Sequence, residues 1–269
     1  MELQEVDSKL STQSYWDEVL RSAQLPRVNS PRSYLYSITM KFADMVLSNK
    51  HYKTFFEVGC GSSGWLPYFA KKYGYRVSGL DYSEVGCQLA EKNLEMLNID
   101  HDTILCKDFF LPDPSEGKKF DVVFSYGVIE HFSNPQEIVG IFNKNFLNDG
   151  GAMITLVPNF TGVNAWMTKI FMRDVYDIHH KITAKQLAAY HTENGMKVLK
   201  NGYAGVFSLG VMPLIKSNHW MFKKDTARRR FFLFLFNTVD KILARIFKLL
   251  PFDMPSRLFS PYVICIATR

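Results

Sequence analysis

The sequence of 269 residues predicts a doubly wound α/β fold, a mostly parallel sheet with helices on both of its faces. Short apolar runs alternate with amphipathic stretches of helical length along the chain. A glycine-rich stretch at 59–64 also joins an early apolar run to the start of a helix. The length suits one such domain with additions, and a hydrophobic content of 47% is enough for a large core.

The apolar runs predict strands, and the segments between them predict helices. Ser83 and the pair Asn134-Pro135 are suited to begin two helices, and Gly195 is suited to end another. We expect strands at 53–58, 75–80, 103–107, 120–125, 152–157, 196–207 and 262–268, and helices at 31–47, 64–73, 83–98, 135–147 and 183–194.

The stretch from Glu57 to Gly64 carries the strongest functional signal. Gly59, Gly61 and Gly64 have the G-x-G-x-x-G spacing of a dinucleotide-binding loop, and Asp81 follows at the end of the next strand. A pyrophosphate binds the positive end of a helix, and a carboxylate at Glu57 would repel it. The stretch therefore favours S-adenosylmethionine (SAM), whose ammonium Glu57 can attract and whose ribose hydroxyls Asp81 can bind.

Further motifs resemble those of the class I SAM-dependent methyltransferases. They are Cys106-Lys107-Asp108-Phe109 after the third strand, the fourth strand Phe120–Ser125, the loop Gly127-Val128-Ile129-Glu130-His131-Phe132, and the turn and fifth strand from Phe146 to Asn159. The resemblance covers roughly residues 50–200. It implies a Rossmann-like fold of seven strands with an antiparallel last strand, and methyl transfer from SAM to a small molecule.

The glycine loop and the resemblance together define an expected cofactor site at the carboxyl ends of the first four strands. Asp108 is expected near the adenine amino group, as the resemblance implies. The full set is Glu57, Gly59, Cys60, Gly61, Gly64, Asp81, Tyr82, Asp108, Phe109, Ser125 and Tyr126.

Three segments outside this core are expected to select the acceptor. They are a helical cap at 1–49, and a lid at 159–181 and a helical insertion at 209–259 within the SAM-binding domain 50–269. Their large side chains predict an acceptor with an apolar or ring portion, and the substrate-binding candidates are Tyr15, Trp16, Phe160, Trp166 and Tyr176. Tyr15 and Trp16 can equally be packing residues.

A hydroxyl acceptor must lose a proton, and histidine is the usual base near neutral pH. His131 is the first candidate because its loop follows the fourth strand and should face the methyl group. A structural role, holding this loop against the next helix, is the alternative. His179 and His180 on the lid are the next candidates, whereas His191 is expected to be structural.

The insertion carries the whole excess of positive charge. Eight basic and two acidic residues lie between Lys223 and Leu250, which accounts for the net charge of +6. The apolar residues here recur at helical spacing, but the longest apolar run, 231–236, is too short to span a bilayer. We expect a helix packed on the sheet, with a dimer contact or an anionic membrane surface as alternatives. Because a nucleic-acid binder usually spreads charge over a wider face, no nucleic-acid partner is expected.

Composition restricts the remaining possibilities. The four cysteines have neither C-x-x-C pairing nor metal-ligand spacing, which is typical of free thiols in a reducing cytosol. Asp149 lies in a turn at the wrong end of the sheet for a catechol-type metal site, so we expect no metal. No signal-peptide pattern follows Met1, and we expect a cytoplasmic monomer or homodimer, peripheral to the membrane if 225–250 binds it.

The predicted function is methyl transfer from SAM to an oxygen or nitrogen of a small molecule. One alternative is a methyltransferase for a lipid-linked or amphiphilic acceptor, such as a quinone precursor or a surface-glycan intermediate, at the membrane surface. Two alternatives of another class are a SAM-binding protein without catalysis and, on the glycines alone, a nicotinamide oxidoreductase.

Overall fold

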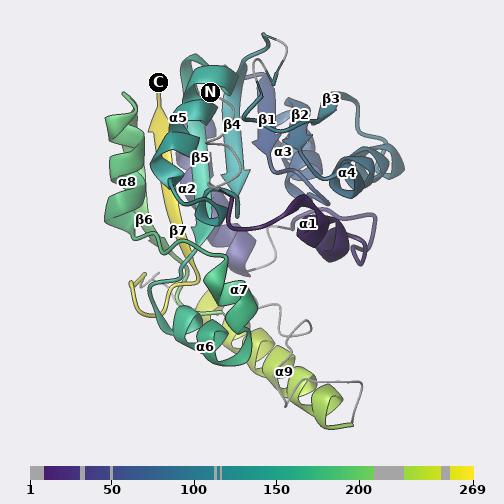
Figure 1. Cartoon of the computed structure of the whole chain (residues 1–269), viewed down its shortest axis with the longest axis vertical. Helices are drawn as coiled ribbons and strands as arrows, with labels where there is room; N and C mark the ends of the chain where they lie inside the picture. The colour runs from purple at the N-terminus through teal and green to yellow at the C-terminus, as the bar shows by residue number, and fades with distance from the viewer. Residues whose placement is uncertain are drawn as a thin grey trace.

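The computed structural model describes residues 9–30, 34–48, 51–111, 114–115, 117–208, 227–249 and 255–269. These residues form a seven-stranded sheet in the order β3-β2-β1-β4-β5-β7-β6 (Figure 1). β1 to β5 pair in parallel, and β7 is antiparallel to both of its neighbours, which confirms the predicted fold class. The strands are β1 (Thr54–Val58), β2 (Arg76–Asp81), β3 (His101–Cys106), β4 (Phe120–Tyr126), β5 (Leu147–Pro158), β6 (Lys197–Ala204) and β7 (Tyr262–Thr268).

Helices cover both faces of this sheet. They are α2 (Tyr34–Leu47), α3 (Trp65–Tyr73), α4 (Glu84–Met96), α5 (Pro135–Phe146) and α8 (Ala184–Glu193). Successive side chains of a strand point to opposite faces, so Phe55 and Phe56 of β1 enter two different buried clusters. The Phe55 cluster includes side chains of α2, α3 and α4, and the Phe56 cluster includes side chains of α5 and α8.

The predicted helix ends are largely confirmed. The Ser83 hydroxyl accepts a hydrogen bond from the Gly86 N–H (3.0 Å) at the start of α4. Gly195 has a φ of +79° directly after α8, as expected for a glycine that ends a helix. Asn134 precedes Pro135 at the start of α5, but its side chain donates to Glu137 and does not cap the helix.

Two elements differ from the sequence prediction. β5 begins at Leu147 and not at 152, because Leu147 already pairs with Phe120 of β4 across a register shift. α2, which belongs to the cap predicted at 1–49 to select the acceptor, instead packs on the sheet, since Met40, Ala43 and Leu47 are buried in the cluster on one of its faces. The segment that reaches the carboxyl ends of the strands is instead 9–30, which contains the short helix α1 (Gln13–Leu20).

The lid and the insertion form a separate layer of helices beyond the sheet. They contribute α6 (Val163–Phe171), α7 (Arg173–Asp177) and α9 (Ala227–Leu249). Phe232 and Phe236 of α9 pack against Met172 and Val175 of the lid, and α9 also contacts α2. Figure 1 shows α9 extending away from the sheet, so the expectation that it packs on the sheet is wrong. None of the described helices is long and apolar enough to cross a membrane.

Gly59 allows a test of the turn after β1. Its φ is +72°, and an added Cβ would lie 2.5 Å from Val128 Cγ2, whereas Gly74, with a φ of +68°, faces open space. We expect Gly74→Ala to lower the free energy of unfolding by about 1–2 kcal/mol for backbone strain alone. Gly59→Ala should cost a further ~1–3 kcal/mol for overpacking. Urea denaturation of both variants measures the difference, and equal losses would contradict the contact with Val128.

Candidate functional site

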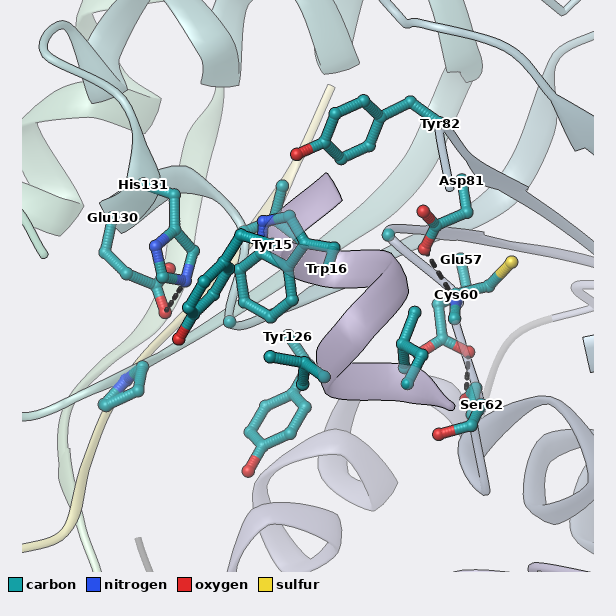
Figure 2. Close-up of a pocket in the computed structure, with 18 of the residues that line it drawn as sticks. Tyr15, Trp16, Glu57, Cys60, Ser62, Asp81, Tyr82, Tyr126, Glu130 and His131 are labelled. Carbon is teal, nitrogen blue, oxygen red and sulfur yellow. Dashed lines mark hydrogen bonds and ion pairs between the residues drawn. The ribbon is translucent and has the colours of Figure 1, made fainter. Parts of the chain in front are cut away.

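A cavity of about 510 Å³ opens at the carboxyl ends of β1, β2 and β4. The chain runs from β1 to β2 and β3 on one side and then crosses to β4 on the other side of β1. In open α/β sheets ligands bind where the strand order reverses in this way. The glycine loop, the loop after β4, the segment 9–29 and part of the lid line it. In Figure 2, Glu130 and His131 lie on one side of the view, Asp81 and Glu57 on the other, and Trp16 lies between them.

Glu57 is buried at the end of β1 and lines the cavity. Its carboxylate accepts a hydrogen bond from the Ser63 hydroxyl (2.5 Å), whose oxygen accepts in turn from the Trp65 N–H (2.8 Å). Burial raises the pKa of Glu57 to about 8, although Ser63 and Arg27 partly oppose this effect. At neutral pH the Glu57 carboxyl group therefore keeps its proton, and a cationic ligand beside it would favour the ionised form.

Asp81 holds the glycine loop in place. Its two carboxylate oxygens accept hydrogen bonds from the backbone N–H groups of Gly61 (2.8 Å) and Ser83 (2.9 Å). Burial raises the pKa of Asp81 to about 6 despite these bonds. Each carboxylate oxygen has a second lone pair, so Asp81 can still accept from the hydroxyls of a ribose.

Asp108 reaches the cavity from the end of β3, together with Phe109 and Tyr82. It forms an ion pair with Lys9, whose ammonium also lies 5.3 Å from the centre of the Tyr82 ring. Sequence reasoning did not assign Lys9 to the site, because no motif surrounds it. Its contacts fasten the N-terminal segment over the place where the resemblance implies an adenine.

The third glycine of the loop, Gly64, packs closely against Asn29. A Cβ at Gly64 would lie 2.9 Å from the backbone nitrogen of Asn29, whose N–H donates to the Gly64 carbonyl (3.0 Å). Asn29 was also not predicted. The close approach allows segment 9–30 to pack directly on the start of α3.

Two histidines and a glutamate meet on the opposite wall of the cavity. Glu130 and His131 lie in the 3₁₀ turn after β4, and His179 follows α7 on the lid. The rings of His131 and His179 are 4.4 Å apart, and the Trp16 ring contacts His131 edge-on at 4.9 Å. His131 Nε2 lies 3.9 Å from a carboxylate oxygen of Glu130.

The backbone determines which nitrogen of each imidazole carries the proton. His131 Nδ1 donates to the Ile178 carbonyl (3.1 Å), and His179 Nδ1 donates to the Val175 carbonyl (2.5 Å). The Nε2 atoms of the neutral rings are therefore free to accept a proton. Burial lowers the pKa of His131 to about 3 and that of His179 to about 4, and it raises the pKa of Glu130 to about 8.

Most of the remaining predicted site residues also line this cavity, including Gly59, Cys60, Tyr126, Tyr15 and Phe160. Glu130 lines it as well, although sequence reasoning gave this residue no role. His191 lies outside it, and its Nε2 accepts from the Thr155 hydroxyl (3.0 Å), which is the expected structural role.

Four predicted site residues are not among the described residues that line the cavity. Ser125 is fully buried within β4. His180 follows His179 but donates its backbone N–H to the Glu130 carbonyl (2.6 Å). Trp166 lies on the outer face of α6 and is 64% exposed, and it borders a separate depression together with Tyr176. The geometry therefore does not support their proposed roles.

The doubly wound sheet and the position of the cavity are those of an α/β protein that binds a nucleoside cofactor at its strand ends. A family model described as "Methyltransferase domain" matches residues 28–201, and the chain belongs to this family. The ubiquinone biosynthesis O-methyltransferase of Pasteurella multocida is 32% identical over 122 residues. This match covers 42% of the present chain and 49% of that protein, so the chain spans about half the length of this curated relative.

Solved structures show the same fold. The plantazolicin methyltransferase BpumL, in complex with SAH, has a TM-score of 0.56 at 16% identity and covers 95% of this chain and 90% of its own. A SAM-dependent methyltransferase from Archaeoglobus fulgidus has a TM-score of 0.54 at 15% identity, with coverages of 96% and 100%. The chain thus belongs to the methyltransferase-domain family and has the fold of these SAM-dependent enzymes, as the sequence motifs predicted.

Glu57 should couple SAM binding to pH. Because its pKa is raised to about 8, binding of the SAM ammonium must release the Glu57 proton at lower pH. We expect SAM affinity to rise between pH 6.5 and 8 by up to about tenfold per pH unit. Glu57→Gln should weaken SAM binding at least ~10-fold at pH 8 and flatten this dependence. Titration calorimetry measures both effects.

Ser63→Ala is the matched control for this experiment. It keeps the Glu57 carboxylate but removes the hydrogen bond that lowers its pKa, so the rise in affinity should move to higher pH. A Glu57→Gln protein with the affinity and pH profile of the wild type would contradict the role of Glu57.

Proposed function

We propose that the protein methylates a hydroxyl oxygen of a small molecule that has a ring or apolar portion. The observation that carries this proposal is the cluster of Glu130, His131 and His179, which shares one cavity with the acid and glycine loop. Trp16 and Phe160 line the same cavity beside the cluster and offer apolar surface to a ring. The O-methyltransferase named above supports oxygen over nitrogen as the acceptor atom.

The residues at the two walls have different tasks in this mechanism. Bound SAM supplies an electrophilic methyl group and a neutral thioether as leaving group. Glu57 would bind the ammonium and Asp81 the ribose, and the aromatic side chains would orient the acceptor along the methyl–sulfur axis. Positioning of this kind can contribute several kcal/mol, about 7–11 in the best cases.

His131 accepts the proton of the acceptor hydroxyl at Nε2. The acceptor oxygen forms the new bond to the methyl carbon, while the carbon–sulfur bond breaks and its electron pair stays on sulfur. Burial disfavours an imidazolium at this place, and Glu130, with an oxygen 3.9 Å from Nε2, can offset part of the charge that develops. General-base catalysis of this kind contributes about 10²–10⁴-fold.

A second observation favours an amphiphilic acceptor taken up at the membrane surface. Exposed apolar side chains of α9 recur every three or four residues and form one stripe, here called the α9 stripe: Phe231, Leu235, Val239, Ile242 and Ile246. Exposed Arg230, Lys241 and Arg245 lie on the neighbouring helix face. A helix with adjacent apolar and basic faces suits an anionic membrane surface, and the lid that α9 packs against lines the cavity.

Catalysis is tested with purified protein, labelled SAM and a metabolite extract, with products identified by mass spectrometry. We expect a labelled product whose formation falls about 10²–10⁴-fold in His131→Ala, because the base is removed. His101→Ala on β3 is the matched control and should retain activity. Binding of SAM without transfer to any component would contradict catalysis, and equal activity of both variants would contradict the role of His131.

Membrane association is tested by flotation of the full chain with vesicles. We expect co-flotation with anionic phosphatidylglycerol vesicles but not with phosphatidylcholine, and loss of co-flotation in the triple variant Phe231→Ser, Leu235→Ser, Ile242→Ser. Leu199→Ser, an exposed apolar residue of β6, is the control and should float like the wild type. Absence of any lipid dependence would contradict this second proposal, and a dimer lost in the triple variant would assign the α9 stripe to a subunit contact.

A further inference from the structure

The cluster of Glu130, His131 and His179 has the composition of a metal site. Each side chain offers one ligand atom, and these three atoms lie within 4.8 Å of one another. Glu130 and His131 are buried, and all three residues line the cavity. Metal ligands at about 2.1 Å from a common ion lie roughly 3–4 Å apart, which is close to the spacing of these three atoms.

In the described part of the chain, the side-chain hydrogen bonds of the cluster engage only the Nδ1 atoms of the two histidines, so both Nε2 atoms and the Glu130 carboxylate oxygens can contact a ligand. Both imidazoles donate Nδ1–H to backbone carbonyls, of Ile178 and Val175, and both therefore present a bare Nε2. Neither carboxylate oxygen of Glu130 has a hydrogen-bond partner among the described residues, although both oxygens are buried. Buried polar atoms normally have partners, so this arrangement is suited to a ligand that accepts lone pairs from all three side chains.

The geometry points to a divalent transition-metal ion bound by Glu130, His131 and His179. Two imidazole nitrogens and one carboxylate suit Zn²⁺, Mn²⁺, Fe²⁺ or Co²⁺ better than Mg²⁺, which prefers oxygen ligands. Metal-binding histidines usually donate their other ring N–H to a carbonyl or carboxylate, as both histidines do here. From the sequence no metal was expected, because a catechol-type site needs clustered Asp and Asn side chains near strands four and five, and such a pattern says nothing of a Glu and two His.

This inference rests on the proposed function and deepens it. Three protein ligands leave coordination positions open toward the cavity, where the acceptor hydroxyl can bind the ion. The ion lowers the pKa of that hydroxyl, whose proton leaves to water, and His131 then serves as a ligand in place of a base. The oxygen bonds to the methyl carbon while the carbon–sulfur pair goes to sulfur, and the ion keeps its oxidation state.

Metal binding is measured on the full chain after treatment with a chelator. Equilibrium dialysis against Zn²⁺ or Mn²⁺ should give one ion per chain, and Co²⁺ should give a visible absorption spectrum that reports nitrogen ligands. We expect at least ~10-fold weaker binding in His179→Ala and in the isosteric Glu130→Gln. His101→Ala should bind like the wild type, and melting temperatures and SAM titration show that each variant is folded.

The outcomes separate this inference from the proposed function. Ion binding that requires the three residues supports the site, and methyl transfer that the chelator abolishes and Zn²⁺ or Mn²⁺ restores supports its role. Methyl transfer unaffected by the chelator, with no bound ion, would overturn the metal site and leave His131 as base. Specific ion binding without methyl transfer to any acceptor would retain the site and overturn the proposed function.

Discussion

The position of β1 between β2 and β4 is the constraint on which the site depends. The chain leaves β1 toward one edge of the sheet and later returns to β4 on its other side. The loops that follow β1 and β4 therefore diverge, and a cavity opens between them. One wall carries Glu57 and the glycine loop, and the other carries Glu130 and His131.

The N-terminal segment closes this cavity through contacts with both walls. The Leu10 N–H donates to the His131 carbonyl (2.8 Å), and Asn29 pairs with Gly64 on the other wall. Lys9 bonds to Asp108, and Trp16 packs on the His131 ring. Because one short segment contacts both the candidate cofactor residues and the cluster, its displacement would open both ends of the site together.

Local patterns were sufficient to predict the sheet and the acids of the cofactor wall. Each strand has its own apolar run, and Glu57 and Asp81 lie next to glycines in the sequence, so short motifs reveal them. Lys9 and Asn29 join the site only through the path of segment 9–30, which has no motif. The proximity of Glu130 and His179 likewise depends on how the chain folds back after α7, and no spacing in the sequence predicts it.

The insertion shows the same limit of local patterns. Helical periodicity correctly predicted an amphipathic helix at α9, but apolar residues occupy more than one of its faces. Phe232 and Phe236 pack on the lid, whereas the α9 stripe stays exposed. Tertiary contacts with Met172 and Val175 determine which apolar face of α9 is buried, and the spacing of apolar residues in the sequence cannot predict this.

Three buried carboxyl groups around one cavity also affect stability. The pKa values of Glu57 and Glu130 are raised to about 8 and that of Asp81 to about 6, in each case chiefly by burial. An acid whose pKa is raised on folding binds its proton more tightly in the native state, so native stability falls as pH rises from its ordinary pKa to the raised value.

Ionisation of these buried groups therefore lowers the free energy of unfolding above neutral pH when no cation lies beside them. A cation bound beside Glu57 would reduce this cost for Glu57, so SAM should stabilise the fold increasingly as pH rises toward 8.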